Sequence, residues 1–413
     1  MRISTLQAFN NGVAGLQRNY ANATRTQEQI STGNRILTPA DDPVASVRLL
    51  QLEQQQNVLS QYDSNLTAAK NSLTQEEVTL NSVNTILQRI RELTLEAGNG
   101  ALGSGERKAI AAELGERENE LMSLMNTRNA RGEYLFSGFQ GKTQPFVIEG
   151  SSYQYKGDEG QRTLQIASSL NIPISDSGKS IFENITNAGR LDRTLTAPAN
   201  STLRVSAPLV SDEVAFSAVG GFPAGGIELE FGADGSYSIY GLPRAAADTP
   251  LVADQRMDDD PSKPDTLVFR GVTLQLDGAA VGGETVQVVP PAEPREKQGI
   301  LNTIANLRAV LENPNSSDDD VRDAVALGVT NLDHAMVNVD AARGNIGARL
   351  NVIETTMTDN QDVTLVNKSV QAELRELDYA EALSRLSFQT IILEAAQQSY
   401  VKISSLNLFN AMR

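Results

Sequence analysis

Residues 52–90 read LEQQQNVLSQYDSNLTAAKNSLTQEEVTLNSVNTILQRI, and their leucines recur at every seventh position. A seven-residue apolar repeat is typical of helices that pack along a narrow seam. Fully burying one leucine contributes about 1.5–3 kcal/mol, so a structure that exposes six of them is implausible. The stretch therefore predicts a long helix that needs partners along its whole length. The predicted rod seam on this helix consists of Leu52, Leu59, Leu66, Leu73, Leu80 and Leu87.

A second stripe of the same kind lies toward the other end of the chain. Between residues 332 and 357 the apolar positions step by four and three, and only Arg343 interrupts them. Two helices with matched stripes satisfy each other most simply as an antiparallel pair. The partner half of the predicted rod seam consists of Leu332, Val339, Ile346 and Ile353.

Both ends of the chain carry one further helical segment beyond a break. Residues 3–31 show an apolar stripe that stops at Gly33, and prolines at 39 and 43 prevent a helix from continuing through the link. Asp378 begins a final segment that runs nearly to the C-terminus. The breaks match, so we expect the chain to fold back with its ends together.

Each terminal stripe has too little around it to form a core in an isolated molecule. We therefore expect neighbouring copies to complete that core, and head-to-tail contacts that do not close build helical filaments. A monomeric extended coiled coil remains the alternative. The predicted assembly interface consists of Leu6, Phe9, Val13, Leu16, Tyr20, Ile30, Leu386, Leu393, Tyr400 and Ile403.

The composition changes between about residues 141 and 295, where glycine and proline become frequent and short alternating runs predict strands. The predicted fold class is α+β: a long antiparallel helical bundle or coiled coil from both chain ends, with a β-rich domain inserted in the middle. A division of that insert into two lobes near residues 190–201 stays open. The predicted domains are a terminal helix and link (1–42), a helical rod (43–140), the β-rich insert (141–295), the returning rod (296–377) and a C-terminal helix (378–413).

The composition argues against several functional classes. The chain has 413 residues, a formal charge of −16 and no cysteine. Such acidity disfavours binding to nucleic acid or anionic membranes, and the missing thiols exclude disulfides, thiolate metal sites and cysteine nucleophiles. We expect no membrane span, because no apolar run reaches 18 residues. We also expect no cleaved signal peptide, because the N-terminal stretch lacks a continuous apolar segment.

Three features could suggest site chemistry, and each is better explained by structure. Residues 98–103 spell G-x-G-x-x-G, but a heptad helix precedes them where a nucleotide site needs a strand. His334 is the only histidine, so it has no second imidazole for a metal site. The acidic runs at 258–260 and 318–320 lack the glycine and distal glutamate of a calcium loop. We predict no catalytic, cofactor or metal site, and no enzymatic activity.

Several short strings resemble the flagellin superfamily of bacterial flagellar axial proteins. Within it they are most similar to the hook-associated protein 3 family of hook–filament junction proteins, because Pro43-Val44 stands where flagellins carry small residues. The resemblance covers about the first 170 and the last 80 residues. The strings are QISTGNRI (29–36), PADD (39–42), GEYLFSG (132–138), QPF (144–146), YKGD (155–158) with Gly160 and Arg162, LDYAEA (377–382) and LNLFN (406–410).

The resemblance implies a structural role outside the cell. Members of this family are exported unfolded through the flagellar type III apparatus without a cleaved signal. They form a homo-oligomeric ring between hook-associated protein 1 and the flagellin filament, with terminal helices lining the axial core and the central domain outward. A cytoplasmic chaperone binds the C-terminal segment before export, and no catalysis or cofactor is attributed to them.

Two other functions stay open at this point. The chain could be a flagellin, the filament subunit itself, because the terminal strings are shared across the superfamily. It could also be a secreted coiled-coil effector or enzyme with its active site in the central insert, where residues 190–295 show no pattern of a known family.

Overall fold

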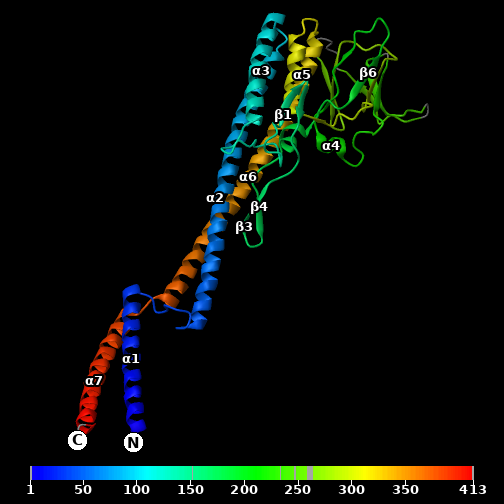
Figure 1. Cartoon of the computed structure of the whole chain (residues 1–413). Helices are drawn as coiled ribbons and strands as arrows, with labels where there is room; N and C mark the ends of the chain where they lie inside the picture. The colour runs from blue at the N-terminus through cyan, green and yellow to red at the C-terminus, as the bar shows by residue number, and fades with distance from the viewer. Residues whose placement is uncertain (1, 151, 233, 246–247, 258–263, 412–413) are drawn as a thin grey trace. The chain divides into compact units, whose positions relative to one another are not determined.

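A computed structural model describes residues 2–150, 152–232, 234–245, 248–257 and 264–411 (Figure 1). The chain divides into two compact units. The terminal unit comprises residues 1–66 and 354–413, and the central unit comprises residues 67–353. The α+β class predicted from the sequence is confirmed, with helices from both chain ends and strands between them.

Seven α-helices form within the described residues, and their boundaries follow local capping signals. Asp42 accepts the backbone N–H of Ala45 at 2.9 Å, and Pro43 occupies the first helical position after it. Ser317 and Asp320 cap the longest helix reciprocally, at 2.9 and 3.1 Å. The helices are α1 (Arg2–Thr32), α2 (Pro43–Ala97), α3 (Ser104–Met125), α4 (Glu213–Ser217), α5 (Ile300–Glu312), α6 (Asp318–Arg375) and α7 (Tyr379–Ala411).

In the central unit α2 and α6 pack against each other through the residues of the rod seam. Leu73, Leu80 and Leu87 are fully buried, as are Val339 and Ile346. Ion pairs flank this seam, with Arg91 to Asp333 at 2.6 Å and Arg343 to Glu77 at 3.1 Å. The higher number on one helix pairs with the lower number on the other, so the two helices are antiparallel. Arg343, which interrupts the apolar stripe, thus serves as a flanking charge. The other seam residues Leu52, Leu59, Leu66, Leu332 and Ile353 are also buried.

Between the helices the chain forms fifteen short strands within the described residues. Three pairs stand apart from the main sheets: β1 with β2, β3 with β4, and β5 with β15. These strands are β1 (Phe146–Glu149), β2 (Ser152–Tyr155), β3 (Thr163–Ala167), β4 (Leu170–Pro173), β5 (Ile185–Thr186) and β15 (Lys297–Gln298). A five-residue π-helical turn, Lys179–Glu183, precedes β5.

Two antiparallel sheets make up the remaining β structure and share one apolar core. One has the order β11-β10-β9-β14-β6, and the other has β12-β13-β7 with β8 also paired to β13. Alternating residues of β9, β13 and β14 point into this core, including Leu229, Leu274 and Val286. The strands are β6 (Asp192–Thr196), β7 (Arg204–Val205), β8 (Leu209–Val210), β9 (Ile227–Phe231), β10 (Ser236–Gly241), β11 (Val252–Arg256), β12 (Asp265–Phe269), β13 (Val272–Asp277) and β14 (Thr285–Val289).

Most of the sequence features that could have suggested site chemistry occupy ordinary structural positions. The glycine-rich residues 98–103 form the turn between α2 and α3. His334 Nδ1 lies 2.8 Å from the carbonyl oxygen of Thr186. Asp320 belongs to the α6 cap, whereas the acidic run 258–260 lies outside the described residues. Within the described ranges no cluster of histidine and carboxylate side chains is suited to hold a metal, and no helix is long and apolar enough to cross a bilayer.

Candidate assembly interface

The terminal helices α1 and α7 lie side by side in the terminal unit (Figure 1). Phe9 and Tyr400 meet with ring centroids 5.3 Å apart, and Leu386 and Leu393 are half-buried along the same line. Val13, Leu16 and Ile30 of the predicted interface are half-buried as well. The side chains of Leu6 and Ile403 lie outside the described residues.

The contact between α1 and α7 leaves much of the predicted stripe open. Tyr20 is 64% exposed and Phe9 is 49% exposed, although both belong to that stripe. The residues of α1 that are buried most deeply are small or polar, namely Ala23, Thr26 and Gln29. The two helices alone therefore form only a thin apolar core.

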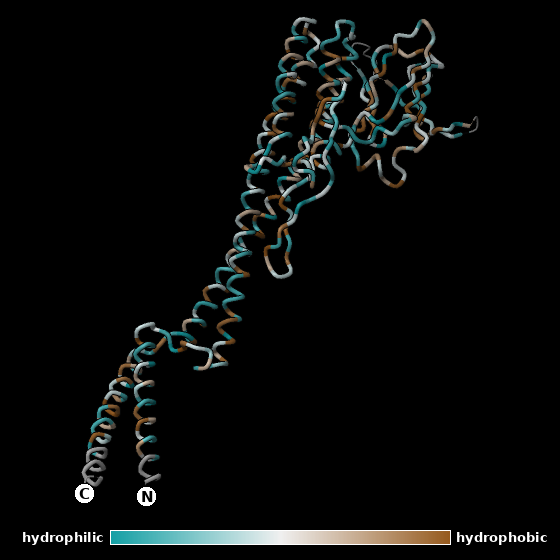
Figure 2. Tube along the Cα trace, in the orientation of Figure 1, coloured by the Kyte–Doolittle hydropathy of each residue, from teal (hydrophilic) through white to brown (hydrophobic). Residues whose placement is uncertain are grey.

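A second apolar surface of α7 faces away from α1. Leu383, Phe388, Ile391 and Ile392 are between 38% and 65% exposed. Figure 2 shows apolar positions recurring along this helix. A helix with apolar residues on more than one side needs more than one partner, and one partner helix covers only one side. The heptad pattern alone did not identify these residues, although their density between 383 and 392 was a usable signal.

The breaks that end α1 and α6 are joined to each other. The Arg35 backbone N–H donates to the Arg375 carbonyl at 2.8 Å, and the Leu377 N–H donates to the Gly33 carbonyl at 3.0 Å. Gly33 has φ +72°, and a Cβ there would lie 2.9 Å from the Tyr379 hydroxyl. The predicted meeting of the two breaks is confirmed, because backbone hydrogen bonds hold them together.

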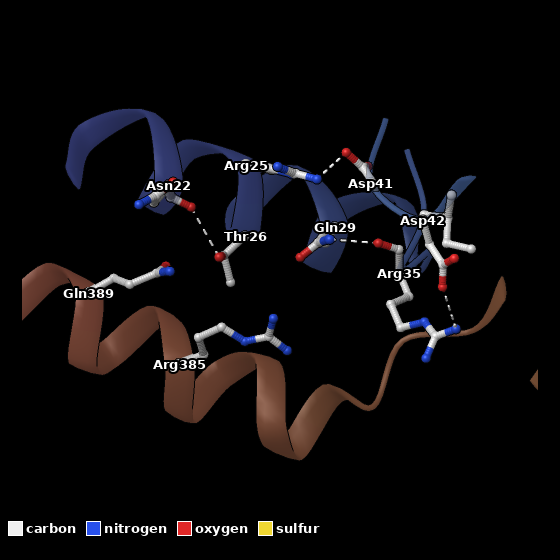
Figure 3. Close-up of a pocket in the computed structure, with 10 residues that line it drawn as sticks. Asn22, Arg25, Thr26, Gln29, Arg35, Asp41, Asp42, Arg385 and Gln389 are labelled. Atoms are coloured by element: carbon white, nitrogen blue, oxygen red, sulfur yellow. Dashed lines mark hydrogen bonds and ion pairs between the residues drawn. The ribbon is translucent and has the colours of Figure 1, made fainter. Parts of the chain in front are cut away.

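Asp41 organises the link between α1 and α2 (Figure 3). Its carboxylate accepts the backbone N–H groups of Leu37 and Thr38 at 2.9 and 3.0 Å, and it also pairs with Arg25. The two backbone donors hold the pKa of Asp41 below its usual value. The link is therefore an ordered turn that hydrogen bonds stabilise and that an ion pair fastens to α1.

The same close-up shows a polar groove of about 380 Å³ between the link and α7. Arg385 and Gln389 line it from α7, opposite Thr26 and Gln29 of α1. The Gln29 side-chain amide donates to the Arg35 carbonyl at 2.6 Å and so ties the groove wall to the link. This end of the helix pair is thus polar, in contrast to the aromatic contact near the chain ends.

A buried ionic cluster fastens the β region to the rod in the central unit. Arg349 of α6 donates two hydrogen bonds to the Asp176 carboxylate, both at 2.9 Å. The Asp176 N–H donates to Oε1 of Glu76 on α2 at 3.1 Å. Burial, and then the nearby Asp176 carboxylate, raise the pKa of Glu76 to about 8, so its side chain is largely protonated at neutral pH.

Comparison with known proteins shows which proteins this chain resembles. Residues 3–141 match the bacterial flagellin N-terminal helical region. Flagellar hook-associated protein 3 of Salmonella typhimurium is 34% identical over 187 residues, which are 45% of this chain and 58% of that protein. The aligned part of this chain thus spans little more than half the length of that relative.

Two further comparisons cover more of the chain. The crystal structure of the flagellar junction protein FlgL from Legionella pneumophila is 25% identical, with a TM-score of 0.62. The superposition covers 80% of this chain and 100% of that one. Flagellin B of Vibrio anguillarum is 24% identical over 392 residues, which are 92% of this chain and 95% of that protein. With helices from both chain ends and a β-rich middle, the chain resembles flagellin-superfamily proteins and, among them, hook-associated protein 3.

Proposed function

We propose that this chain is a structural adaptor of the bacterial flagellum that joins the hook, through hook-associated protein 1, to the flagellin filament. The observation that carries the proposal is the apolar surface of α7, which α1 covers on one side only. Such a helix is completed by helices of neighbouring subunits. The likeness to hook-associated protein 3 and to a junction protein of known structure supports this reading.

The proposal includes a homo-oligomeric ring whose subunits touch through Phe9, Val13, Leu16, Tyr20 and the matching residues of α7. It places the chain outside the cell, after export without a cleaved signal peptide and with a cytoplasmic chaperone bound beforehand. It assigns no catalytic role, and the relatives carry the names of structural flagellar proteins.

Deletion of the gene tests the proposal directly. Loss of an adaptor should leave hooks intact while unpolymerised flagellin appears in the medium, and the cells should lose motility. Loss of a filament subunit should instead leave no flagellin to release, so that outcome would support the alternative.

A flagellin is the second candidate, because Flagellin B of Vibrio anguillarum aligns with nearly the whole chain. Purified protein separates the two functions. An adaptor should stop at short oligomers, whereas a filament subunit should polymerise into long filaments under seeding conditions. Long homopolymers visible by electron microscopy would contradict the adaptor function.

A further inference from the structure

The heptad stripe by which α6 faces α2 changes character along the helix. In the central unit its buried residues are apolar: Leu332, Val339, Ile346 and Ile353. The same seven-residue spacing continues into the terminal unit, which contains residues 43–66 of α2 and 354–375 of α6. There it reaches Asn360 and Asn367, each 7% exposed. The stripe therefore stays buried but becomes polar.

Five side-chain atoms at stripe positions of this stretch are buried without a hydrogen-bond partner among the described residues. Those on α6 belong to residues that step by four and three along one face, as the apolar seam residues do. A buried polar group without a partner loses its hydrogen bonds to water and gains none in return. These atoms, which we term the polar seam, are Asn360 Nδ2, Thr364 Oγ1, Asn367 Nδ2, Gln371 Nε2 and Gln56 Oε1.

The apolar burial that holds the two helices together is one-sided along this stretch. Leu52 and Leu59 of α2 are buried, whereas residues 354–375 of α6, all of which the structure describes, include no buried apolar side chain. Separation of the helices returns the polar seam to water, where each of its groups finds hydrogen bonds. The closed pair is therefore less stable here than in the central unit.

Both ends of the stretch are held more firmly than its middle. At one end the Arg375 guanidinium donates to Oδ1 of Asn34 at 3.0 Å, beside the backbone hydrogen bonds that join the two breaks. At the other end Leu66 and Ile353 are fully buried. The weak stretch thus lies between two stable ones, so separation there differs from fraying of a helix end.

Once α2 has moved away, α6 has little to keep it helical along this stretch. β-branched residues lose side-chain freedom in a helix, and short isolated helices are marginal in water. Separation should therefore expose backbone amides as well as side chains. Seven residues between 355 and 370 are β-branched: Thr355, Thr356, Thr358, Val363, Thr364, Val366 and Val370.

We propose that α2 and α6 separate locally at the polar seam, within residues 43–66 and 354–375, while both ends of that stretch stay closed. The elements of a protein that move come from its least stable parts, so this opening gives the helical framework a place to bend. The inference concerns a single copy of the chain and does not depend on the adaptor function.

Pairs of spin labels on the full chain measure the separation directly. Because the chain has no cysteine, V58C/V363C places one label on each helix of the weak stretch. V78C/V337C is the matched pair on the same helices in the central unit, and all four valines are exposed. In dilute monomer, pulsed electron–electron resonance should give one narrow distance distribution for V78C/V337C and an added population at longer distance for V58C/V363C. A single narrow distribution for V58C/V363C overturns the inference.

Leucines in the polar seam show whether its polar groups cause the opening. In the V58C/V363C background, N360L/N367L should reduce the longer-distance population about fivefold or more, because it replaces unpaired amides with apolar burial. K368L, at an exposed position of the same helix, should leave that population unchanged. A longer-distance population that persists in N360L/N367L would contradict the proposal.

Hydrogen exchange of the unlabelled chain provides a second measurement. Amides of residues 43–66 and 354–375 should exchange about 100-fold faster, or more, than those of residues 71–94 and 326–347. The fastest exchange should lie near the middle of the stretch, around residues 56 and 364. Exchange that instead rises steadily from residue 66 to residue 43 indicates fraying of a helix end and overturns the inference.

Discussion

Replacing Asn360 with leucine should make the α2–α6 pair of the terminal unit more stable. Asn360 is 7% exposed, and its amide nitrogen lacks a hydrogen-bond partner among the described residues. Leaving such a polar group buried and unpaired costs about 1–3 kcal/mol. Leucine removes that cost and adds apolar burial. A local stabilisation of about 2–3 kcal/mol is therefore expected.

Hydrogen exchange with mass spectrometry on the full chain measures this effect where it occurs. Two-unit proteins need not unfold in one step, so a single melting temperature would mix contributions. A gain of about 2 kcal/mol should slow the exchange of amides in residues 43–66 and 354–375 by roughly 30-fold. Exchange in the central unit should not change.

K368L is the matched control, because Lys368 is exposed and lies on the same helix eight residues farther on. Leucine at that position gains no burial, so exchange should stay within about threefold of the parent. If N360L exchanges as fast as the parent, or faster, the amide is not an unsatisfied buried group.

Three other outcomes follow from the structure. L80A should destabilise the central unit by about 2–5 kcal/mol in urea unfolding, because Leu80 is fully buried, whereas V78A at an exposed position should cost less than about 0.5 kcal/mol. The raised pKa of Glu76 means that the folded state holds a proton that the unfolded state releases, so the stability of the parent falls as pH rises from about 5 to 8. E76Q should lack this fall. Thermal melts with the same pH profile for E76Q and the parent would contradict this prediction. The lowered pKa of Asp41 means that its ionised carboxylate stabilises the folded link at neutral pH, and that this stabilisation is lost as pH falls below about 4. D41N should remove the stabilisation, so the Leu37 amide should exchange faster at pH 7 in D41N than in the parent.

The sequence predicted the helical framework well because its signals are local. A leucine every seventh residue requires a seam wherever the rest of the chain lies, and the seam residues from Leu66 to Leu87 are fully buried. Gly33 and Asp378 mark breaks through their own backbone and capping chemistry, and those breaks meet as expected. Whether the terminal stripe residues touch neighbouring subunits stays a prediction.

Other features needed the structure because distant residues create them. Strand β14 pairs with β9 and also with β6, about 90 residues earlier, and no local pattern specifies that choice. Leu383 and Ile391 lie off the heptad positions of Leu386 and Leu393, so the heptad pattern does not predict an apolar surface that includes them. Asn360 and Asn367 continue the heptad spacing past Met357, but their polar side chains carry no apolar signal for burial.

The short pair of β5 and β15 has a consequence for how this protein can vary. Ile185 pairs with Gln298, the Asn187 N–H donates to the Glu296 carbonyl at 2.9 Å, and the Asn187 amide reaches the Arg295 carbonyl at 3.0 Å. The two ends of the segment between these strands therefore lie side by side. Residues 188–295 begin and end side by side, so the part of this segment that does not contact α6 can change in length without altering the spacing of the helices. The two sheets can therefore change in size and sequence while the helical framework stays the same.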